Sequence, residues 1–160
     1  MKLENQIKTK VIKINGEDVT VSSYLSTIEK NTLIEVSLAN AMSTATGNLQ
    51  RLAYDASIYT LIALRYSDIK IEDMDKMTLC DVYDLLETNG ILVKILNVIE
   101  ELSHNETKEL IAYADEAYSY TVKKLNSSAS GIESAIGALL QMSEEAGLKM
   151  AQAVQEKTTE

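Results

Sequence analysis

The chain has 160 residues, of which 46% are apolar and 24% are charged, with a formal net charge of −9. This length suits one domain with its own core, and the composition argues against a disordered chain and against a membrane protein. Binding to nucleic-acid phosphates requires clustered Lys and Arg, so the acidic balance argues against a nucleic-acid partner.

The cysteine content and the apolar stretches indicate in which cellular compartment the protein is expected. The single cysteine, Cys80, cannot form an intramolecular disulfide, which fits a reducing compartment. The first ten residues, MKLENQIKTK, contain no apolar stretch that resembles a signal-peptide core. The longest apolar stretch, IYTLIALRY, is too short to span a bilayer. We therefore expect a cytoplasmic protein that does not bind membranes.

Residues 9–22 are expected to form a β-hairpin, because apolar and polar residues alternate on both sides of the sequence NG, which is typical of hairpin turns. A two-residue turn would place Ile14 opposite Glu17, whereas a four-residue NGED loop places Ile14 opposite Val19. We predict the four-residue loop, because it pairs apolar residues on one face. That face would consist of Ile12, Ile14, Val19 and Val21. An isolated hairpin is marginal in water, so this face must pack on helices or on another chain.

The only basic cluster lies beside this hairpin and consists of Lys2, Lys8, Lys10 and Lys13. We interpret these lysines as a solvated strand edge that resists aggregation. A phosphate-binding site is the alternative interpretation.

The rest of the chain predicts a mainly α fold, a bundle of about five to six helices. Capping-box spacing marks two helix starts, at Ser26 with Glu29 and at Thr78 with Asp81, and the sequence NG at residues 89–90 is typical of a left-handed helix end. The expected helices span about 27–42, 49–66, 78–89, 91–102 and 106–125, with a last one from about residue 132. The helix at 49–66 is apolar on several faces, which predicts a central buried position.

We expect a single helical domain over residues 1–155, with the hairpin at about 9–22 and the helices within about 27–155. Residues 156–160 are expected to form a frayed tail. The stretch SDIKIEDMDKM is expected to be a loop or a loose turn.

The stretch GIESAIGALL predicts a weak last helix. Gly131, Gly137 and Gly147 would each cost roughly 1 kcal/mol relative to Ala in a helix interior, so packing must stabilise this helix. Its apolar face suits another helix, which makes it a candidate partner-binding surface. The residues concerned are Ile132, Ile136 and Leu139.

The stretch AYADEAYSY places Tyr113, Tyr118 and Tyr120 within two helical turns. One interpretation is that these tyrosines fill the core of a chain that has no Phe or Trp. The other is an exposed patch that docks a partner, because a Tyr ring buries area while its hydroxyl keeps a hydrogen bond. Together with the last helix and with Val19 and Val21 of the hairpin, these residues are the candidate partner-binding residues.

The patterns that mark enzymatic or metal sites are missing. The six glycines are scattered singly, unlike those of phosphate-binding loops. The single histidine, His104, and Cys80 are far apart in the sequence. Asp73 and Asp75 alternate as in a calcium loop, but the third ligand, the central Gly and the closing Glu are lacking. We therefore predict a protein that is not an enzyme, with no catalytic, cofactor-binding or metal-binding residues.

Three stretches carry a resemblance to a known family. The order VIKINGEDVTVSSYLSTIEKNTLI, then YDLLETNGI, then SYTVKKLNSSASGIESAI resembles small proteins encoded by tailed bacteriophages and prophages of low-GC bacteria. The similarity covers about residues 11–136. In that family a hairpin precedes a YLP turn and a helical domain, and here Ser26 stands where Pro would be.

The resemblance implies a protein of virion morphogenesis, and the layout is similar to that of tail assembly chaperones. Those proteins are small, acidic and mostly helical with an N-terminal β element, and they coat the tape-measure protein before the tail tube polymerises. The implied partner is a phage protein, namely a tape-measure, tail or capsid protein, met in the cytoplasm of the bacterial host, with a homo-oligomer as a further option.

Two alternatives remain. The first is a structural virion component, such as a capsid-surface, connector or tail protein, in which the hairpin adds a strand to a neighbour's sheet. The second is an early phage protein that binds and inhibits a host factor.

Overall fold

The computed structural model describes residues 7–43, 46–127, 137 and 139–142. The described chain begins with strands β1 (Thr9–Ile14) and β2 (Glu17–Ser22), and the named elements that follow are helices joined by loops. The helices are α1 (Thr27–Ala41), α2 (Arg51–Tyr66), the short 3₁₀ helix η1 (Met74–Lys76), α3 (Leu79–Thr88), α4 (Ile91–Leu102) and α5 (Glu106–Ser127). The predicted mainly α fold with an N-terminal hairpin is confirmed. Ile132, Ile136 and the expected tail at 156–160 lie outside the described residues.

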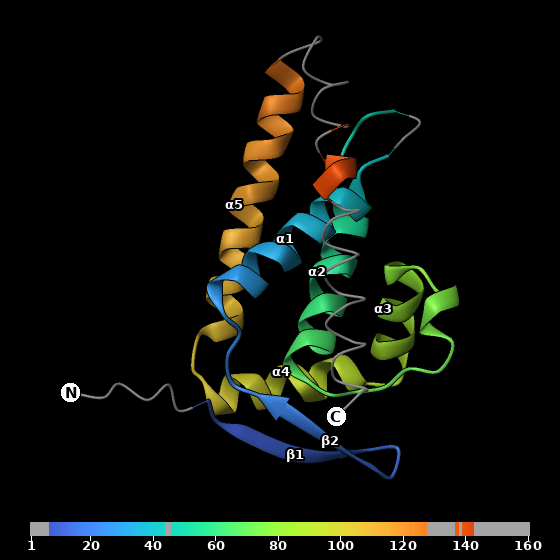
Figure 1. Ribbon diagram of the computed structural model, residues 1–160, viewed down its shortest axis with the longest axis vertical. Helices are drawn as coiled ribbons and strands as arrows, with labels where there is room; N and C mark the ends of the chain where they lie inside the picture. The colour runs from blue at the N-terminus through green and yellow to red at the C-terminus, as the bar shows by residue number, and fades with distance from the viewer. Residues whose placement is uncertain (1–6, 44–45, 128–136, 138, 143–160) are drawn as a thin grey trace, which may run out of the picture.

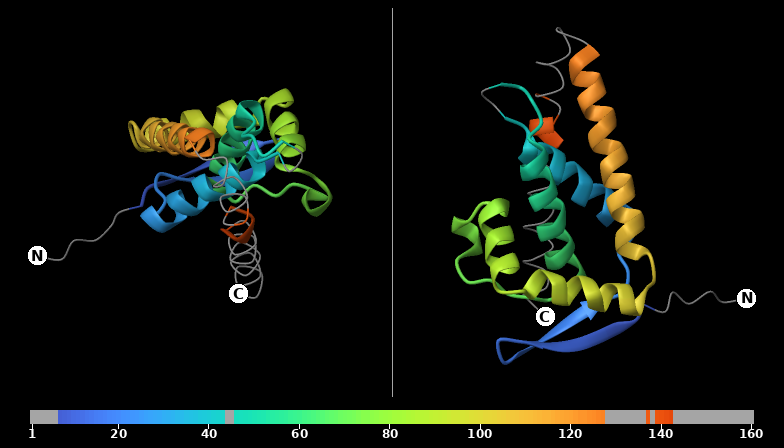
Figure 2. Two further views of the ribbon diagram at one scale, coloured as in Figure 1. Left: turned by 90° about the horizontal axis from the view of Figure 1, so that it is seen from above. Right: turned by 180° about the vertical axis from the view of Figure 1, so that it is seen from behind.

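Figure 1 shows α2 and α5 running along the long axis of the molecule, with α1 crossing between them and α3 on the far side of α2. Helix α4 lies across the lower end of α2 and α5, and the hairpin lies beneath α4. The two further views in Figure 2 agree with this arrangement. The hairpin therefore covers one end of a helical bundle.

The hairpin turn contains two residues, and the predicted four-residue loop is wrong. The strands pair with Ile14 opposite Glu17 and Ile12 opposite Val19. Both turn residues have positive φ angles, 52° at Asn15 and 90° at Gly16. Two such residues form the turn whose twist matches that of the flanking strands, and Asn-Gly suits it best. The turn geometry therefore outweighs the pairing of Ile14 with Val19 on which the prediction relied.

The apolar face of the hairpin survives this correction. The two registers differ by two residues in their pairing, and side chains alternate with a period of two, so each side chain keeps its face. Ile14, Val19 and Val21 are buried, and Ile12 packs partly buried against the same core. The face contacts α4, so the hairpin packs on helices of its own chain.

Both predicted capping boxes are present. At the start of α1, Ser26 N–H donates to a Glu29 carboxylate oxygen at 2.9 Å, and Glu29 N–H donates to Ser26 Oγ at 3.3 Å. At the start of α3, Thr78 N–H donates to Asp81 Oδ2 at 2.9 Å, and Asp81 N–H donates to Thr78 Oγ1 at 3.2 Å. Hydrogen bonds from the Thr78 hydroxyl and N–H hold the pKa of Asp81 below its usual value.

Helix α2 occupies the centre of the bundle, as predicted, and contacts α1, α3, α4 and α5. Its fully buried side chains include Tyr54, Ile62 and Tyr66. Leu52, in the first turn of α2, faces outward and is 85% exposed. Tyr54 turns inward in that first turn, because its hydroxyl donates to the carbonyl oxygen of Ala114 on α5 at 2.6 Å.

The two-residue turn predicts the effect of replacing Gly16. Gly16→Ala should lower the free energy of unfolding by about 1 to 2 kcal/mol, because a Cβ disfavours left-handed backbone. Asn15→Gly is the matched control, since glycine adopts positive φ freely, and it should have a smaller effect. Urea unfolding followed by circular dichroism measures both. A Gly16→Ala protein as stable as the parent would argue for the longer loop.

Candidate partner-binding groove

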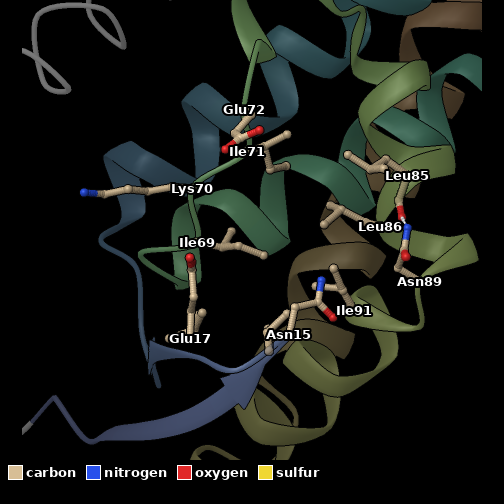
Figure 3. A pocket seen from close by; sticks show the side chains of 12 residues that line it. Asn15, Glu17, Ile69, Lys70, Ile71, Glu72, Leu85, Leu86, Asn89 and Ile91 are labelled. Carbon is tan, nitrogen blue, oxygen red and sulfur yellow. Dashed lines mark hydrogen bonds between the residues drawn. The ribbon is translucent and has the colours of Figure 1, made fainter.

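An open groove lies between the hairpin, the segment 69–72 and the junction of α3 with α4. Its volume is about 290 Å³. Seven of the twelve described residues that line it are Ile, Leu or Val, namely Ile14, Val19, Ile69, Ile71, Leu85, Leu86 and Ile91. Figure 3 shows the labelled apolar side chains around this space, contributed by three separate parts of the chain. The groove, defined by these residues, is the candidate site considered below.

The wall formed by residues 69–72 is held in place by a contact with β2. Asp68 N–H donates to the Thr20 carbonyl oxygen at 3.1 Å, and Thr20 N–H donates to Asp68 Oδ1 at 2.7 Å. Val21 also forms an isolated antiparallel bridge with Ser67. The chain leaving α2 is therefore attached to the outer edge of β2, and Ile69 and Ile71 follow directly along the groove.

The opposite wall depends on the turn between α3 and α4. Gly90 has φ 62°, the left-handed conformation expected at this helix end. This turn places Leu86 at the end of α3 beside Ile91 at the start of α4. Leu86 is fully buried, whereas Leu85 is 37% exposed and presents its side chain to the groove.

Two carboxylates, those of Glu17 and Glu72, lie at the rim of the groove. Both residues are exposed, and neither forms an ion pair within the described part of the chain. Lys70 is the basic residue of the lining, and Figure 3 shows its side chain extending away from the other labelled side chains. The groove thus has an apolar floor and an acidic rim.

The predicted tyrosine patch divides into two parts. Tyr113 and Tyr120 are 63% and 67% exposed and lie seven residues apart, on the same side of α5. Tyr118 is half-buried against Tyr54, with 4.9 Å between the ring centroids, and its hydroxyl donates to the Leu49 carbonyl oxygen at 3.3 Å. Tyr118 therefore contributes to packing, while the other two rings face outward.

The remaining predicted site residues that the structure describes, Val19, Val21 and Leu139, are buried and belong to the hydrophobic core. Val19 lines the groove, but Val21 is fully buried beneath the sheet. Leu139 is also buried. Among the predicted partner-binding residues that the structure describes, Val19 is the one that lines the groove.

Sequence reasoning missed Ile69 and Ile71, because they lie in a stretch that was expected to be a loop. The alternation of Ile69, Lys70 and Ile71 is a strand-like signal that pointed to a segment lying along another element. Leu85, Leu86 and Ile91 were visible as apolar helix positions, but their convergence with the hairpin depends on tertiary packing.

A second cluster, of polar residues, is buried between α1, α2 and α5. Glu106 is 8% exposed and receives a hydrogen bond from the Tyr66 hydroxyl at 2.8 Å. Lys30 Nζ lies 2.7 Å from the same Glu106 oxygen and 4.6 Å from the Tyr24 ring centroid. Burial and the bond to Glu106 raise the pKa of Tyr66 above its usual value. Because each polar group has a partner, the cluster holds three helices together.

A third cluster connects α2 to α5 at the surface. Arg51 Nη2 lies 2.7 Å from Asp115 Oδ1, and Arg51 Nε lies 2.9 Å from Asp55 Oδ1. The guanidinium carbon lies 5.0 Å from the Tyr118 ring centroid. The hydrogen bond to Asp55 is the main cause that raises the pKa of Arg51 above its usual value. The side chains are about half exposed, so the contribution to stability is small.

Asp73 and His104, the candidate metal ligands of the sequence, are not part of a metal-binding cluster among the described residues. Asp73 is paired with Lys76, and His104 is 78% exposed, with its Nδ1 3.1 Å from a Glu100 oxygen. Within residues 7–43, 46–127, 137 and 139–142, no three His, Cys, Asp or Glu side chains are grouped so that they could hold a metal ion. None of the helices in the described part of the chain combines the length and apolar character needed to cross a membrane.

Comparison of the chain with protein-family models, with curated proteins and with solved structures finds no match.

The buried tyrosines predict how stability changes at alkaline pH. Burial raises the pKa of both Tyr54 and Tyr66 above the usual value of 10.0. The stabilisation linked to these groups is complete below about pH 10 and is lost as pH rises above it, because the unfolded chain then releases protons that the folded chain retains. The melting temperature should therefore fall as pH rises from about 9 to about 11.5, the range in which tyrosines of the unfolded chain lose their protons.

A pair of double variants tests whether the buried tyrosines cause this loss of stability at alkaline pH. Replacing both Tyr54 and Tyr66 by Phe should reduce the slope of melting temperature against pH, whatever its effect on stability at neutral pH. Replacing the exposed Tyr113 and Tyr120 by Phe is the matched control and should leave the slope nearly unchanged. Equal slopes in the two double variants would contradict the assignment to the buried pair.

Proposed function

We propose that this chain is a non-catalytic protein-binding protein of bacteriophage morphogenesis that acts as a tail assembly chaperone. The observation that carries the proposal is the open apolar groove bounded by the hairpin, residues 69–72 and the α3–α4 junction. Of its apolar lining, Leu85 is exposed and Ile69 and Ile71 are partly exposed. Covering these side chains with a partner would release water from both surfaces, which favours binding of another protein.

The groove suits an amphipathic helix as its ligand. The hairpin, residues 69–72 and the α3–α4 junction each supply an apolar wall. Together they can enclose one apolar face of a helix, as in other complexes in which a helix binds in a groove. The rim carboxylates of Glu17 and Glu72 favour Lys or Arg beside that face. The net charge of −9 adds a long-range attraction to a basic segment and keeps the complex soluble.

The family resemblance supports the tape-measure protein as the source of this helix. A long helical partner offers repeated amphipathic segments, and a small acidic protein that covers them would prevent premature association. In this proposal the chain acts in the cytoplasm of the bacterial host and is absent from the finished virion.

The second candidate is a structural virion component. It is favoured by the outer edge of β1, which pairs with no other strand among the described residues. Such an edge can add a strand to the sheet of a neighbouring virion protein. Mass spectrometry of purified phage particles distinguishes the two candidates. A fixed copy number in the particle supports the structural component, and absence from the particle supports the chaperone.

Two leucine variants test the groove as the binding site. Leu85→Asp places a charge at the groove and should abolish co-purification with the tape-measure protein when the two are co-expressed. Leu52→Asp is the matched control, since Leu52 is also on a helix, is 85% exposed and lies outside the groove. This variant should bind as the parent does.

Both variant proteins should retain the circular dichroism spectrum and melting temperature of the parent, because neither leucine is buried. Co-purification that is lost equally in both variants, or in neither, would place the binding site elsewhere or remove the tape-measure protein as the partner.

A further inference from the structure

We infer that two copies of this chain associate through β1, whose outer edge pairs antiparallel with the same edge of a second copy in a register centred on Val11. The two hairpins then form one four-stranded sheet. This inference does not rest on the proposed function, because it uses a different surface and a different partner.

The outer edge of β1 carries unpaired backbone groups. Ser23 N–H donates to the Lys8 carbonyl oxygen at 2.9 Å. This bond shows which residues of β1 direct their backbone N–H and C=O groups toward β2 and which direct them away. Lys8, Lys10, Ile12 and Ile14 therefore direct their backbone groups toward β2, and Thr9, Val11 and Lys13 direct theirs outward. In the described part of the chain these three residues make no hydrogen bond through their outward groups.

The corresponding edge of β2 is closed. Thr20, which directs its backbone groups away from β1, bonds Asp68 through both its N–H and its carbonyl oxygen. The sheet therefore offers a single free edge among the described residues. In Figure 1 and in the right-hand view of Figure 2, β1 lies at one end of the molecule, and the helices extend away from it.

The spacing of the free groups is self-complementary. In a two-fold pairing centred on Val11, Val11 faces its own copy and Thr9 faces Lys13, so each of the three free positions meets another free position. If the two-fold axis passed through Lys10 or Ile12 instead, one of the three free positions would face a residue outside β1. The Val11 side chain, 58% exposed in the single chain, gains an apolar neighbour in this register.

The lysines of β1 favour the same register. Lysines on an edge strand normally oppose pairing with another chain. In the register centred on Val11, however, Lys13 faces Thr9, Lys10 faces Ile12 and Lys8 faces Ile14, so no lysine directly faces another. A centre at Lys10 or Lys13 would place two copies of that lysine opposite each other. Lys10 and Lys13 are also already paired, at 2.7 Å with Glu101 and 3.3 Å with Asp18.

Light scattering on a concentration series tests the association. The parent protein should pass from the mass of one chain to twice that mass as concentration rises. Val11→Pro should remain a monomer, because proline removes the outward N–H and is tolerated at an edge position that does not bond the partner strand. Val11→Thr is the matched control, since it keeps the N–H and the β-branched side chain, and it should still dimerise.

Thermal melting shows whether both variants are folded, and the Leu85→Asp variant should dimerise as the parent does. A parent that stays monomeric at every concentration, or a folded Val11→Pro protein that still dimerises, would overturn the inference.

Cysteine cross-linking tests the register independently of Val11→Pro. In a Cys80→Ser background, Val11→Cys should form a disulfide-linked dimer on mild oxidation, because facing residues lie within disulfide reach. Thr9→Cys is the matched control. Its two copies would be offset by roughly 13 Å along the strands and should not cross-link. Equal cross-linking at both positions, or none at position 11, would overturn the register.

Discussion

The arrangement of this molecule depends on the need of two buried tyrosine hydroxyls for hydrogen-bond partners. Tyr54 and Tyr66 lie at opposite ends of α2 and are 1% and 0% exposed. Each donates to α5, one to the Ala114 carbonyl oxygen and the other to the Glu106 carboxylate. A buried hydroxyl without a partner would cost about 1 to 3 kcal/mol, so these bonds fix where α5 lies along α2. The buried Glu106 carboxylate in turn pairs with Lys30 of α1, so α1 is also held against α2 and α5.

A single contact defines both candidate interaction surfaces. The two hydrogen bonds between Thr20 and Asp68 close the outer edge of β2 and attach the chain that leaves α2. The same attachment places Ile69 and Ile71 along the groove. Closing one edge of the hairpin therefore creates the wall of the groove and leaves the edge of β1 for pairing. The two surfaces are distinct, so one chain can bind a helix and a second copy together.

Features that depend on a few neighbouring residues could be predicted from the sequence. Ser26 with Glu29, Thr78 with Asp81, and Gly90 mark helix ends through local hydrogen bonds and backbone angles, and all occur where expected. The hairpin register could not be predicted from apolar pairing, because two registers keep the same face and the turn decides between them. The groove could not be predicted either, since Ile71, Leu85 and Ile14 meet only once the helices are packed.

The charge distribution is consistent with self-association at the hairpin in spite of the net charge of −9. Lys10 and Lys13 lie on β1 and Lys8 directly precedes it. The hairpin lies at one end of the molecule, and the helices extend away from that end. Electrostatic interactions between exposed charges decay over a distance of about 8 Å at physiological ionic strength. Two helical bundles directed away from a common sheet therefore repel each other weakly. In the proposed dimer the hairpin would separate the acidic helical bodies of the two copies while joining their backbones. A helix at this position could not do so, because its backbone groups are already paired.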